Sequence, residues 1–316
     1  MKAFGLADED STAAMLDVPT PEAGPGEVRI RVRASSVNGW DVFVMSGSAR
    51  AMMEHRYPVI GGKDYAGVID SVGEGVTGFA AGDEVAGIVP GGAFLSTGSY
   101  AEQVVVPAEG FIVKKPESLS FEQAASIGLA ALTALVSVDA AEVSDGDVVL
   151  IVGAAGGVGS YAVQLAAQRG ATVVATARPE DEEWIRGLGA AEVIDYSGDV
   201  AAAVRSAHPD GVDGLIVAVQ LGADFAATAG LVKDGGRIAS TVGGADAEGV
   251  AERDIRATNV MGESDPDVFA QVVGLAAAGT IQVPITRTFT FDQLPEALGL
   301  VGETRSRGKF AVTIST

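Results

Sequence analysis

The chain of 316 residues contains no cysteine and only two histidines, His55 and His208. The missing cysteines exclude disulfides, thiolate zinc ligands and thiol nucleophiles. The two histidines lie far apart in the sequence, so a metal site made of several histidines within one chain is excluded as well. Sites of these kinds therefore cannot account for the function of the chain.

Positive charge is also scarce: the chain has 21 lysines and arginines against 42 aspartates and glutamates, and its formal net charge is −21. Such acidity repels nucleic acid and anionic membranes. No apolar run is long enough to span a bilayer without interruption. The N-terminal stretch MKAFGLADEDSTAAML has acids where a signal peptide needs a basic start and an apolar core. We expect a soluble, cytoplasmic protein whose partners include neither nucleic acid nor membrane.

The first third of the chain has the pattern of short strands, and the chain is long enough for a second domain. In PGEVRIRVRASSV, the apolar residues Val28, Ile30 and Val32 alternate with arginines, which predicts a half-buried strand. Glycines break the following apolar sequence into short runs. This pattern is typical of a barrel-like, mostly antiparallel unit.

The sequence pattern changes after Pro116. A long helix rich in alanine and leucine is predicted to start at the N-cap residue Ser120. From Asp147 the strands VVLIV, TVVATA, EVIDY, GLIVAV and GRIAST alternate with helices. Unbroken apolar runs such as residues 148–152 predict strands buried on both faces, and crossover helices between them predict a doubly wound parallel sheet. The tail, with an alternating strand from Phe310 to Ile314, is expected to fold back onto the first domain.

The stretch GAAGGVG, residues 153–159, follows the strand VVLIV and opens a helix. This context fits a dinucleotide-binding turn, although Ala154 stands where the first of three glycines is expected. Gly156 would let the backbone approach a pyrophosphate, and Gly159 would permit close packing of helix and strand. The N–H groups and the dipole at the helix N-terminus favour phosphate. The alternative is a tight turn with a structural role only.

The acid expected at the end of the second strand of this domain is absent, since Ala177 stands there and Arg178 follows. A carboxylate would accept a hydrogen bond from the ribose 2′-hydroxyl and would repel a 2′-phosphate, whereas an arginine can pair with that phosphate. We therefore expect NADPH as the cofactor. The acidic run at residues 179–183 weakens this preference if its side chains point inward, and Arg178 could also be an ordinary surface arginine.

Several stretches together resemble a known family: YPVIGGKDYAGVIDSVGEGVTGFAAGDEVAG, GSYAEQVVVPAE, LTAL, GAAGGVGSYAVQLAAQRGA and RGKFAV. Nearly the whole chain resembles the zinc-free quinone oxidoreductase branch of the medium-chain dehydrogenase/reductase superfamily, the branch that includes zeta-crystallin. The resemblance implies an α/β fold with a GroES-like β-barrel-type catalytic domain at residues 1–122 and 266–316 and a Rossmann domain with a doubly wound parallel sheet at residues 123–265. It also implies an active site in the cleft between the domains, and a homodimer.

The resemblance further implies contacts with the cofactor. Asn38 and Asp41 match residues near the nicotinamide end, and Thr133 matches a threonine that contacts the cofactor. Tyr196 matches a tyrosine near the 2′-phosphate, and Arg305 approximates an arginine that closes over the cofactor. A turn role for Asn38 and a half-buried strand position for Tyr196 are the structural alternatives. The complete set of expected cofactor-binding residues is Asn38, Asp41, Thr133, Ala155, Gly156, Gly157, Val158, Gly159, Arg178, Tyr196, Val219, Val242 and Arg305, with Arg307 as an equally close choice for the last.

Zinc-dependent members of the superfamily place a cysteine at about Asn38 and a His-Glu pair at about Lys63 and Asp64, and this chain lacks both patterns. Without a Lewis acid, a substrate carbonyl has to be polarised by hydrogen bonds alone. That requirement suits activated acceptors such as quinones and α,β-unsaturated carbonyls. We therefore expect a zinc-independent reductase with no metal site.

Three residues are candidates for the catalytic work. Asn38 is the candidate donor to the substrate oxygen, and Lys63 and Tyr65 are candidates for proton delivery or oxyanion stabilisation. An ion pair between Lys63 and Asp64 or another acid is the structural alternative, and solvent is the default proton source. The favoured function is NADPH-dependent hydride transfer to a quinone or an α,β-unsaturated carbonyl. The alternatives are a specialised enoyl reductase of secondary metabolism and a non-catalytic NADPH-binding protein.

Overall fold

The computed structural model describes residues 1–219, 224–245, 250–260, 262, 265–303 and 306–314. The chain forms two compact units, and each is described by itself. Unit 1 comprises Met1–Leu129 and Asp265–Thr316, and unit 2 comprises Ala130–Ser264. The sequence-based division falls after residues 122 and 265, whereas the structure divides the chain after residues 129 and 264. The first boundary differs because one helix, α2 (Phe121–Ala140), runs through it.

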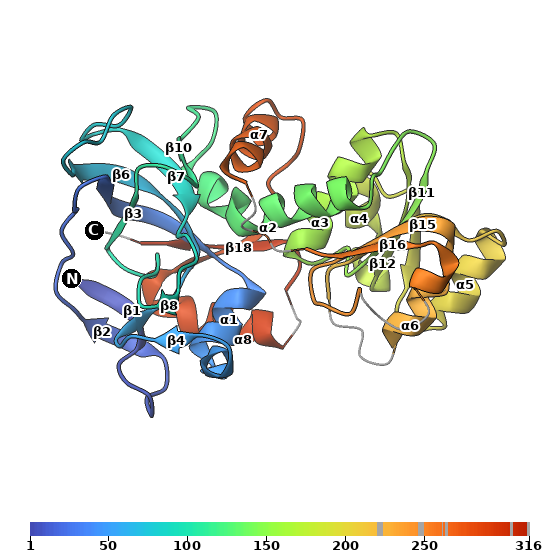
Figure 1. Cartoon of the computed structure of the whole chain (residues 1–316), viewed down its shortest axis with the longest axis horizontal. Coiled ribbons are helices and arrows are strands. Elements are labelled where there is room, and N and C mark those ends of the chain that lie inside the picture. Colours follow the sequence, from blue (N-terminus) through green and yellow to red (C-terminus); the bar gives the residue numbers. More distant parts are fainter. Residues whose placement is uncertain (220–223, 246–249, 261, 263–264, 304–305, 315–316) are drawn as a thin grey trace. The chain divides into compact units, whose positions relative to one another are not determined.

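Unit 1 consists mainly of β-strands, which Figure 1 shows together with the helices beside them. Its elements in chain order are β1 Lys2–Leu6, β2 Ala14–Asp17, β3 Glu27–Val37, α1 Gly39–Met45, η1 Ser48–Ala51, β4 Glu54–His55, β5 Val59–Ile60, β6 Asp64–Val72, β7 Glu84–Ile88, β8 Phe94–Leu95, β9 Gln103–Pro107, β10 Ile112–Lys114, the start of α2, α7 Pro266–Ala277, β17 Ile285–Thr290, η4 Phe291–Gln293, α8 Leu294–Gly302 and β18 Lys309–Thr313.

Strand β3 organises the main sheet of unit 1, whose strand order is β10-β7-β6-β3-β18-β17, with β9 also paired to β3. The predicted alternation is confirmed, because Val28, Ile30 and Val32 are fully buried while the arginines between them are half-buried. After Ala34 the alternation stops, and Ser35 begins a stretch that is buried on both faces up to Val37. The last strand of the chain pairs antiparallel with this stretch, so the C-terminal segment lies beside the residues that follow β3.

Unit 2 contains a six-stranded sheet in the order β13-β12-β11-β14-β15-β16, with every pair of neighbours parallel. Numbered along the sheet in sequence, this order is 3-2-1-4-5-6, that of the doubly wound dinucleotide-binding fold. Helices α3 and α4 pack against β11, β12 and β13, while α5 and α6 contact each other (Figure 1). The elements are β11 Val148–Val152, α3 Gly157–Gln168, β12 Thr172–Ala177, η2 Pro179–Asp181, α4 Glu182–Gly187, β13 Glu192–Asp195, α5 Val200–Ala207, β14 Val212–Val217, α6 Asp224–Ala229, β15 Val232–Ser240, η3 Ala251–Arg253 and β16 Arg256–Asn259.

Helix α2 begins as the sequence predicts. The hydroxyl of Ser120 accepts a hydrogen bond from the backbone of Gln123, and the Gln123 side chain accepts one from the Ser120 backbone, which is a capping box. By length and composition alone this helix, with a mean hydropathy of 1.5, could cross a membrane. However, 72 % of its most apolar 18-residue stretch is buried inside the structure. Such burial is typical of a helix in the core of a folded domain.

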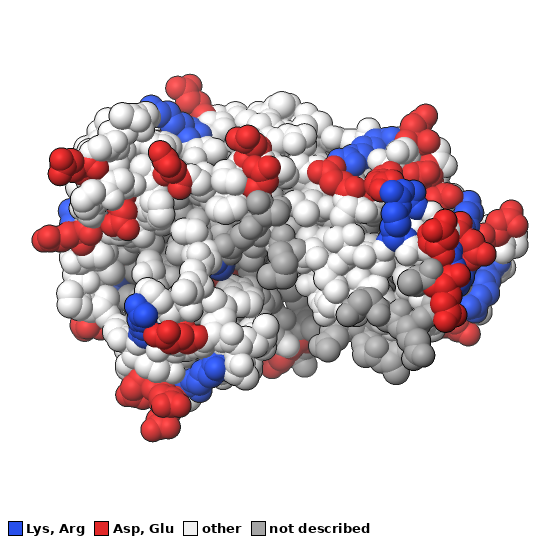
Figure 2. Space-filling model, viewed as in Figure 1, with Lys and Arg blue, Asp and Glu red and all other residues white. Residues whose placement is uncertain are grey.

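The charged surface agrees with the acidic composition. On the face drawn in Figure 2, acidic side chains are scattered over both units, and the described basic side chains lie singly or in small groups beside acidic ones. The described part of this face therefore presents no broad basic patch of the kind that binds nucleic acid.

Candidate functional site

The glycine-rich turn lies between β11 and α3, at the carboxyl end of the first strand of the parallel sheet. The tight turn requires a positive φ, and this conformation, with φ of 81°, falls on Gly153. The alanine that follows therefore introduces no backbone strain into the turn. A Cβ on Gly159 would lie 2.1 Å from the Gly153 carbonyl oxygen, so only glycine permits this approach of helix to strand. The departure of Ala154 from the glycine pattern is therefore compatible with the turn.

The geometry of this turn fits the phosphates of a dinucleotide. A Cβ on Gly156 would meet only the Gly153 carbonyl oxygen, at 3.4 Å, so the turn is open on this side. Residues 155–158 are half-buried and accessible, and they lead into a helix of 12 residues whose first N–H groups have no partner within the helix. The turn also adjoins β14, where the strand order reverses, and ligands of such sheets bind at that point. This geometry is compatible with the predicted contact of a pyrophosphate with Ala155, Gly156, Gly157, Val158 and Gly159.

Two other predicted cofactor residues lie at the same edge of the sheet. Val219 follows β14 and is 38 % exposed. Its side chain lies against Gly153: a Cβ added to this glycine would lie 2.7 Å from the Val219 side chain. Val242 follows β15 and is 41 % exposed. Thr133, in contrast, is buried in helix α2, and its carbonyl accepts a hydrogen bond from Ser137. Arg305 lies outside the described residues.

The side chains at the end of β12 form a small cluster. Ala177 is buried, and the guanidinium of Arg178 donates from Nε and Nη2 to Asp181 Oδ2 at 3.2 and 3.1 Å. Arg178 Nη1 lies 3.3 Å from Glu180 Oε1. Tyr196 follows the neighbouring strand, where its N–H donates to the Ala177 carbonyl, and it is 54 % exposed. The acidic run does point inward at Asp181, which weakens the preference for NADPH expected from Arg178 alone.

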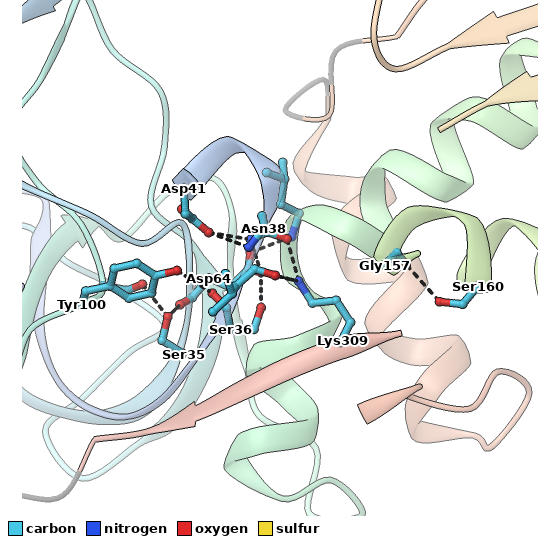
Figure 3. A network of polar contacts seen from close by, with 12 residues as sticks. Ser35, Ser36, Asn38, Asp41, Asp64, Tyr100, Gly157, Ser160 and Lys309 are labelled. Carbon is cyan, nitrogen blue, oxygen red and sulfur yellow. Dashed lines mark hydrogen bonds and ion pairs between the residues drawn. The ribbon is translucent and has the colours of Figure 1, made fainter. Parts of the chain in front are cut away.

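Unit 1 contains a buried polar cluster that the sequence did not predict (Figure 3). The ammonium of Lys309 donates to Asn38 Oδ1 at 2.6 Å and lies 3.5 Å from Asp64 Oδ2. Asn38 Nδ2 donates to Asp64 Oδ2 at 2.8 Å and to Asp41 Oδ2 at 3.1 Å. Lys309 is 1 % exposed, and both carboxylates are buried as well. The cluster thus holds one cation against an amide and one acid in the interior of unit 1, and the second acid, Asp41, contacts the amide.

This arrangement corrects the predicted role of Asn38. Its amide nitrogen has two hydrogens, and Asp41 and Asp64 accept both, while the amide oxygen faces the Lys309 ammonium. A substrate oxygen would therefore find no free N–H group on this side chain. Asn38 is also the N-cap of α1, so the structural alternative of a turn residue is realised.

The two acids of the cluster have different surroundings. Burial, followed by the charge of Asp64, raises the pKa of Asp41 to about 6. Asp64 accepts hydrogen bonds from the Ser36 hydroxyl at 2.6 Å and from the Leu129 N–H at 2.7 Å. The second contact depends on Gly128, whose Cβ would lie 2.1 Å from Asp64 Oδ1. A break of α2 at this glycine therefore lets the helix backbone reach the carboxylate.

A cavity of about 210 Å³ lies beside the cluster in unit 1. Its walls include Trp40, Asp41, Lys63, Val89 and Phe94. Most of the lining side chains are apolar, and the ammonium of Lys63 donates to the Val89 carbonyl at 2.9 Å. Lys63 is therefore the one of the three predicted catalytic residues that lines this cavity.

The position of Tyr65 contradicts its predicted catalytic role. The side chain is fully buried in the hydrophobic core of unit 1, and its hydroxyl lies 3.5 Å from the Phe111 carbonyl oxygen. Burial also raises its pKa above the ordinary value, which makes loss of the proton harder.

Sequence reasoning missed the role of Lys309. It lies in RGKFAV, a stretch that resembles the family but contains no further sign of a buried lysine. Tyr100 was missed as well: it is fully buried and its hydroxyl donates to the Ser36 carbonyl. Lys309 comes close to Asn38 only through the pairing of the distant strands β18 and β3, and Tyr100 reaches Ser36 across 64 residues of sequence. A sequence signal for these contacts would have required the strand register.

Within the ranges that the structure describes, no group of three or more histidine, cysteine, aspartate or glutamate residues is arranged to hold a metal ion. The Asp64 carboxylate already has partners: the ammonium of Lys309 lies beside it, and it accepts hydrogen bonds from a backbone N–H group and from a side-chain hydroxyl. The donor set at this position therefore does not fit a divalent ion.

Two family models match the chain. Residues 24–117 match the alcohol dehydrogenase GroES-like domain, and residues 188–312 match the zinc-binding dehydrogenase domain. Among solved structures, the quinone oxidoreductase of Coxiella burnetii is 29 % identical with a TM-score of 0.85, over 100 % of this chain and 99 % of that one. An NAD-dependent alcohol dehydrogenase is 30 % identical with a TM-score of 0.88, over the whole of both chains.

Several curated relatives have similar sequences. A mitochondrial NAD(P)H oxidoreductase of Bos taurus is 32 % identical over 92 % of this chain and 82 % of its own length. A chloroplast envelope quinone oxidoreductase homolog of Arabidopsis thaliana is 35 % identical over 64 % of this chain, and the match spans 62 % of that relative. A component of the pikromycin polyketide synthase of Streptomyces venezuelae is 33 % identical over 97 % of this chain, which corresponds to 8 % of that protein.

Proposed function

Because the chain belongs to the medium-chain dehydrogenase/reductase superfamily, with quinone oxidoreductases among its relatives, we propose that it transfers hydride from NADPH to a quinone or an α,β-unsaturated carbonyl without zinc. The observation that carries the proposal is the open glycine turn of unit 2, at the point where the strand order reverses. The fold alone would not support this proposal, since proteins with one fold catalyse many different reactions.

The cofactor, when bound, supplies the hydride, and the protein supplies binding, orientation and electrostatics. In unit 2, the N–H groups of residues 157–159 would hold the pyrophosphate at the start of α3, since the Gly156 N–H already donates to the Gly153 carbonyl. In unit 1, the cavity of about 210 Å³ is smaller than the roughly 300–1,000 Å³ of sites for drug-sized ligands. We therefore propose a small acceptor, with one ring or a short chain.

Lys63 is the proposed group that polarises the acceptor. Its ammonium is almost completely buried at the wall of the cavity, and the Val89 carbonyl holds it in place. A fixed cation stabilises the negative charge that develops on the acceptor oxygen. The proton that completes the reduction comes from solvent in this proposal, because Tyr65 is buried in the core.

A specialised enoyl reductase is the second candidate function. The observation in its favour is the polyketide synthase component, whose match covers almost the whole of this chain and has 33 % identity. Such an enzyme would use the same cofactor turn and would differ only in the acceptor. A protein that binds NADPH without turnover is the third possibility.

Rates of NADPH oxidation with 1,4-benzoquinone and with 2-cyclohexen-1-one separate these functions. A quinone reductase consumes NADPH with benzoquinone, and an enone reductase consumes it with cyclohexenone. Thioester enones would be the next acceptors for an enoyl reductase. Cofactor binding by calorimetry without oxidation by any of these acceptors would contradict the proposed enzyme and leave a binding protein.

Activity is expected to be independent of zinc. The Asp64 carboxylate is already occupied by Lys309 and by hydrogen-bond donors, so removal of divalent ions should leave the protein and its rate unchanged. The measurement is the NADPH oxidation rate before and after dialysis against a chelator, with elemental analysis of the same samples. Stoichiometric zinc in the dialysed protein, or loss of rate that added zinc restores, would refute this expectation.

A further inference from the structure

Arg178, the residue expected from the sequence to pair with the cofactor 2′-phosphate, is already engaged by two acids. Three of its guanidinium nitrogens contact carboxylate oxygens: Nε and Nη2 contact Asp181, and Nη1 contacts Glu180. All of these residues belong to one short segment that follows β12, so the contacts are local. The positive charge that would favour a phosphate is therefore neutralised before any ligand arrives.

The two acids differ in their exposure to solvent. The Asp181 side chain is 2 % exposed, whereas the Glu180 side chain is 62 % exposed. Water and salt screen an exposed carboxylate strongly, and an exposed side chain can move away. A buried carboxylate is screened less and stays where the fold holds it. Asp181 is therefore the acid whose charge persists at the guanidinium.

We propose that Asp181 is a specificity-determining residue, whose buried carboxylate holds the Arg178 guanidinium and lowers the affinity for the 2′-phosphate of NADPH relative to the 2′-hydroxyl of NADH. The inference rests on the proposed use of a nicotinamide dinucleotide in unit 2. Its physical basis is that a phosphate arriving at Arg178 meets an ion pair with little net charge. The preference for NADPH is accordingly below about tenfold in the unmodified protein.

The same geometry explains why Asp181 does not itself bind the ribose. An acid that selects NADH accepts a hydrogen bond from the ribose hydroxyl, which requires an exposed carboxylate at the strand end. Ala177 occupies that strand end, and Asp181 is buried. Asp181 acts through Arg178, and the discrimination is electrostatic.

The test is the substitution Asp181→Asn, which keeps the shape of the side chain and removes its charge. Dissociation constants for NADPH and NADH are measured by calorimetry at one fixed ionic strength. We expect the ratio of the NADH to the NADPH constant to rise at least about tenfold, a change of about 1.4 kcal/mol, with NADH affinity nearly unchanged. Adenosine 2′,5′-bisphosphate and adenosine 5′-monophosphate, measured in the same way, assign the change to the 2′-phosphate.

Two further variants test whether the effect is specific to the pair of Asp181 and Arg178. Glu182→Gln changes the net charge by the same amount in the same segment, but Glu182 pairs with Arg186 and not with Arg178, so the ratio should stay constant. Arg178→Gln in the Asp181→Asn background should abolish the gain, because the effect acts through the guanidinium. Asp181→Ser serves as a second neutral variant if the Asn variant melts near the assay temperature.

The outcomes separate this inference from the proposed function. An unchanged ratio, or weaker NADPH binding in both neutral variants, overturns the role of Asp181 even if the enzyme reduces quinones. A raised ratio supports that role even if no acceptor is reduced, in which case only the proposed reaction fails. Failure of the unmodified protein to bind either dinucleotide contradicts both.

Discussion

Replacing Lys63 by methionine is expected to lower kcat/KM for 1,4-benzoquinone by about 100-fold and to leave NADPH affinity unchanged. Methionine fills nearly the same space but cannot donate a hydrogen bond or carry charge. Removal of one preorganised donor to a developing oxyanion costs about 10²- to 10³-fold in rate. The measurements are steady-state kinetics with both substrates varied and NADPH binding by calorimetry.

A matched control for this prediction is Lys115→Met. The Lys115 side chain is also mostly buried in unit 1 and donates to the Leu119 carbonyl at 2.8 Å, but it is absent from the lining of the cavity. Its replacement should leave kcat/KM within about threefold, because the reaction does not use it. Unaltered kinetics in Lys63→Met would remove Lys63 from the reaction, and a loss of NADPH affinity with kcat preserved would assign it to the cofactor.

Replacing Lys309 by methionine is expected to destabilise unit 1 by about 3–5 kcal/mol, the cost of removing one partner from a buried ion pair. The variant leaves the Asp64 carboxylate without its cation and Asn38 Oδ1 without its donor, inside a core that excludes water. The free energy of unfolding in urea measures the loss. Because the chain has only two tryptophans, Trp40 in unit 1 and Trp184 in unit 2, Trp184→Phe in every sample makes the fluorescence report on unit 1.

Two further variants serve as controls for the stability loss expected in Lys309→Met. Glu296→Gln removes an exposed ion pair with Arg287 within unit 1, so it should cost less than about 1 kcal/mol. The double variant Lys309→Met/Asn38→Ala should lose less stability than the two single variants together, because each single change already breaks their shared 2.6 Å hydrogen bond. A loss below about 1 kcal/mol in Lys309→Met itself would show that the buried cation is not what holds the cluster together.

Much of the fold follows from local patterns in the sequence. The alternation in β3 and the unbroken apolar run of β11 each mark a strand because burial imposes those periods directly on the sequence. Strand β16, with the sequence RATN, was missed because only its alanine is even half-buried, and it forms by pairing with β15 at the edge of the sheet. Edge strands with little buried surface leave no such period.

The candidate site was less predictable because its key contacts join distant parts of the chain. The turn at residues 153–159 could be recognised, since its strand, glycines and helix are consecutive. The contact of Lys309 with Asn38 spans 271 residues and depends on the register of β18 against β3. The sequence showed Asn38 as a potential donor, but it could not show that its two N–H bonds are already used inside unit 1.

The most direct test of the central claim is to follow the transferred hydrogen. NADPH deuterated at the transferring position of nicotinamide C4 is oxidised by the enzyme with 2-cyclohexen-1-one as acceptor, and the cyclohexanone formed is examined by mass spectrometry and NMR. Direct hydride transfer predicts one deuterium per product molecule, bound to the β-carbon, with the second added hydrogen coming from water. Reduced product without deuterium at that carbon, or no reduction of either an enone or a quinone by a protein that binds NADPH, would contradict the account.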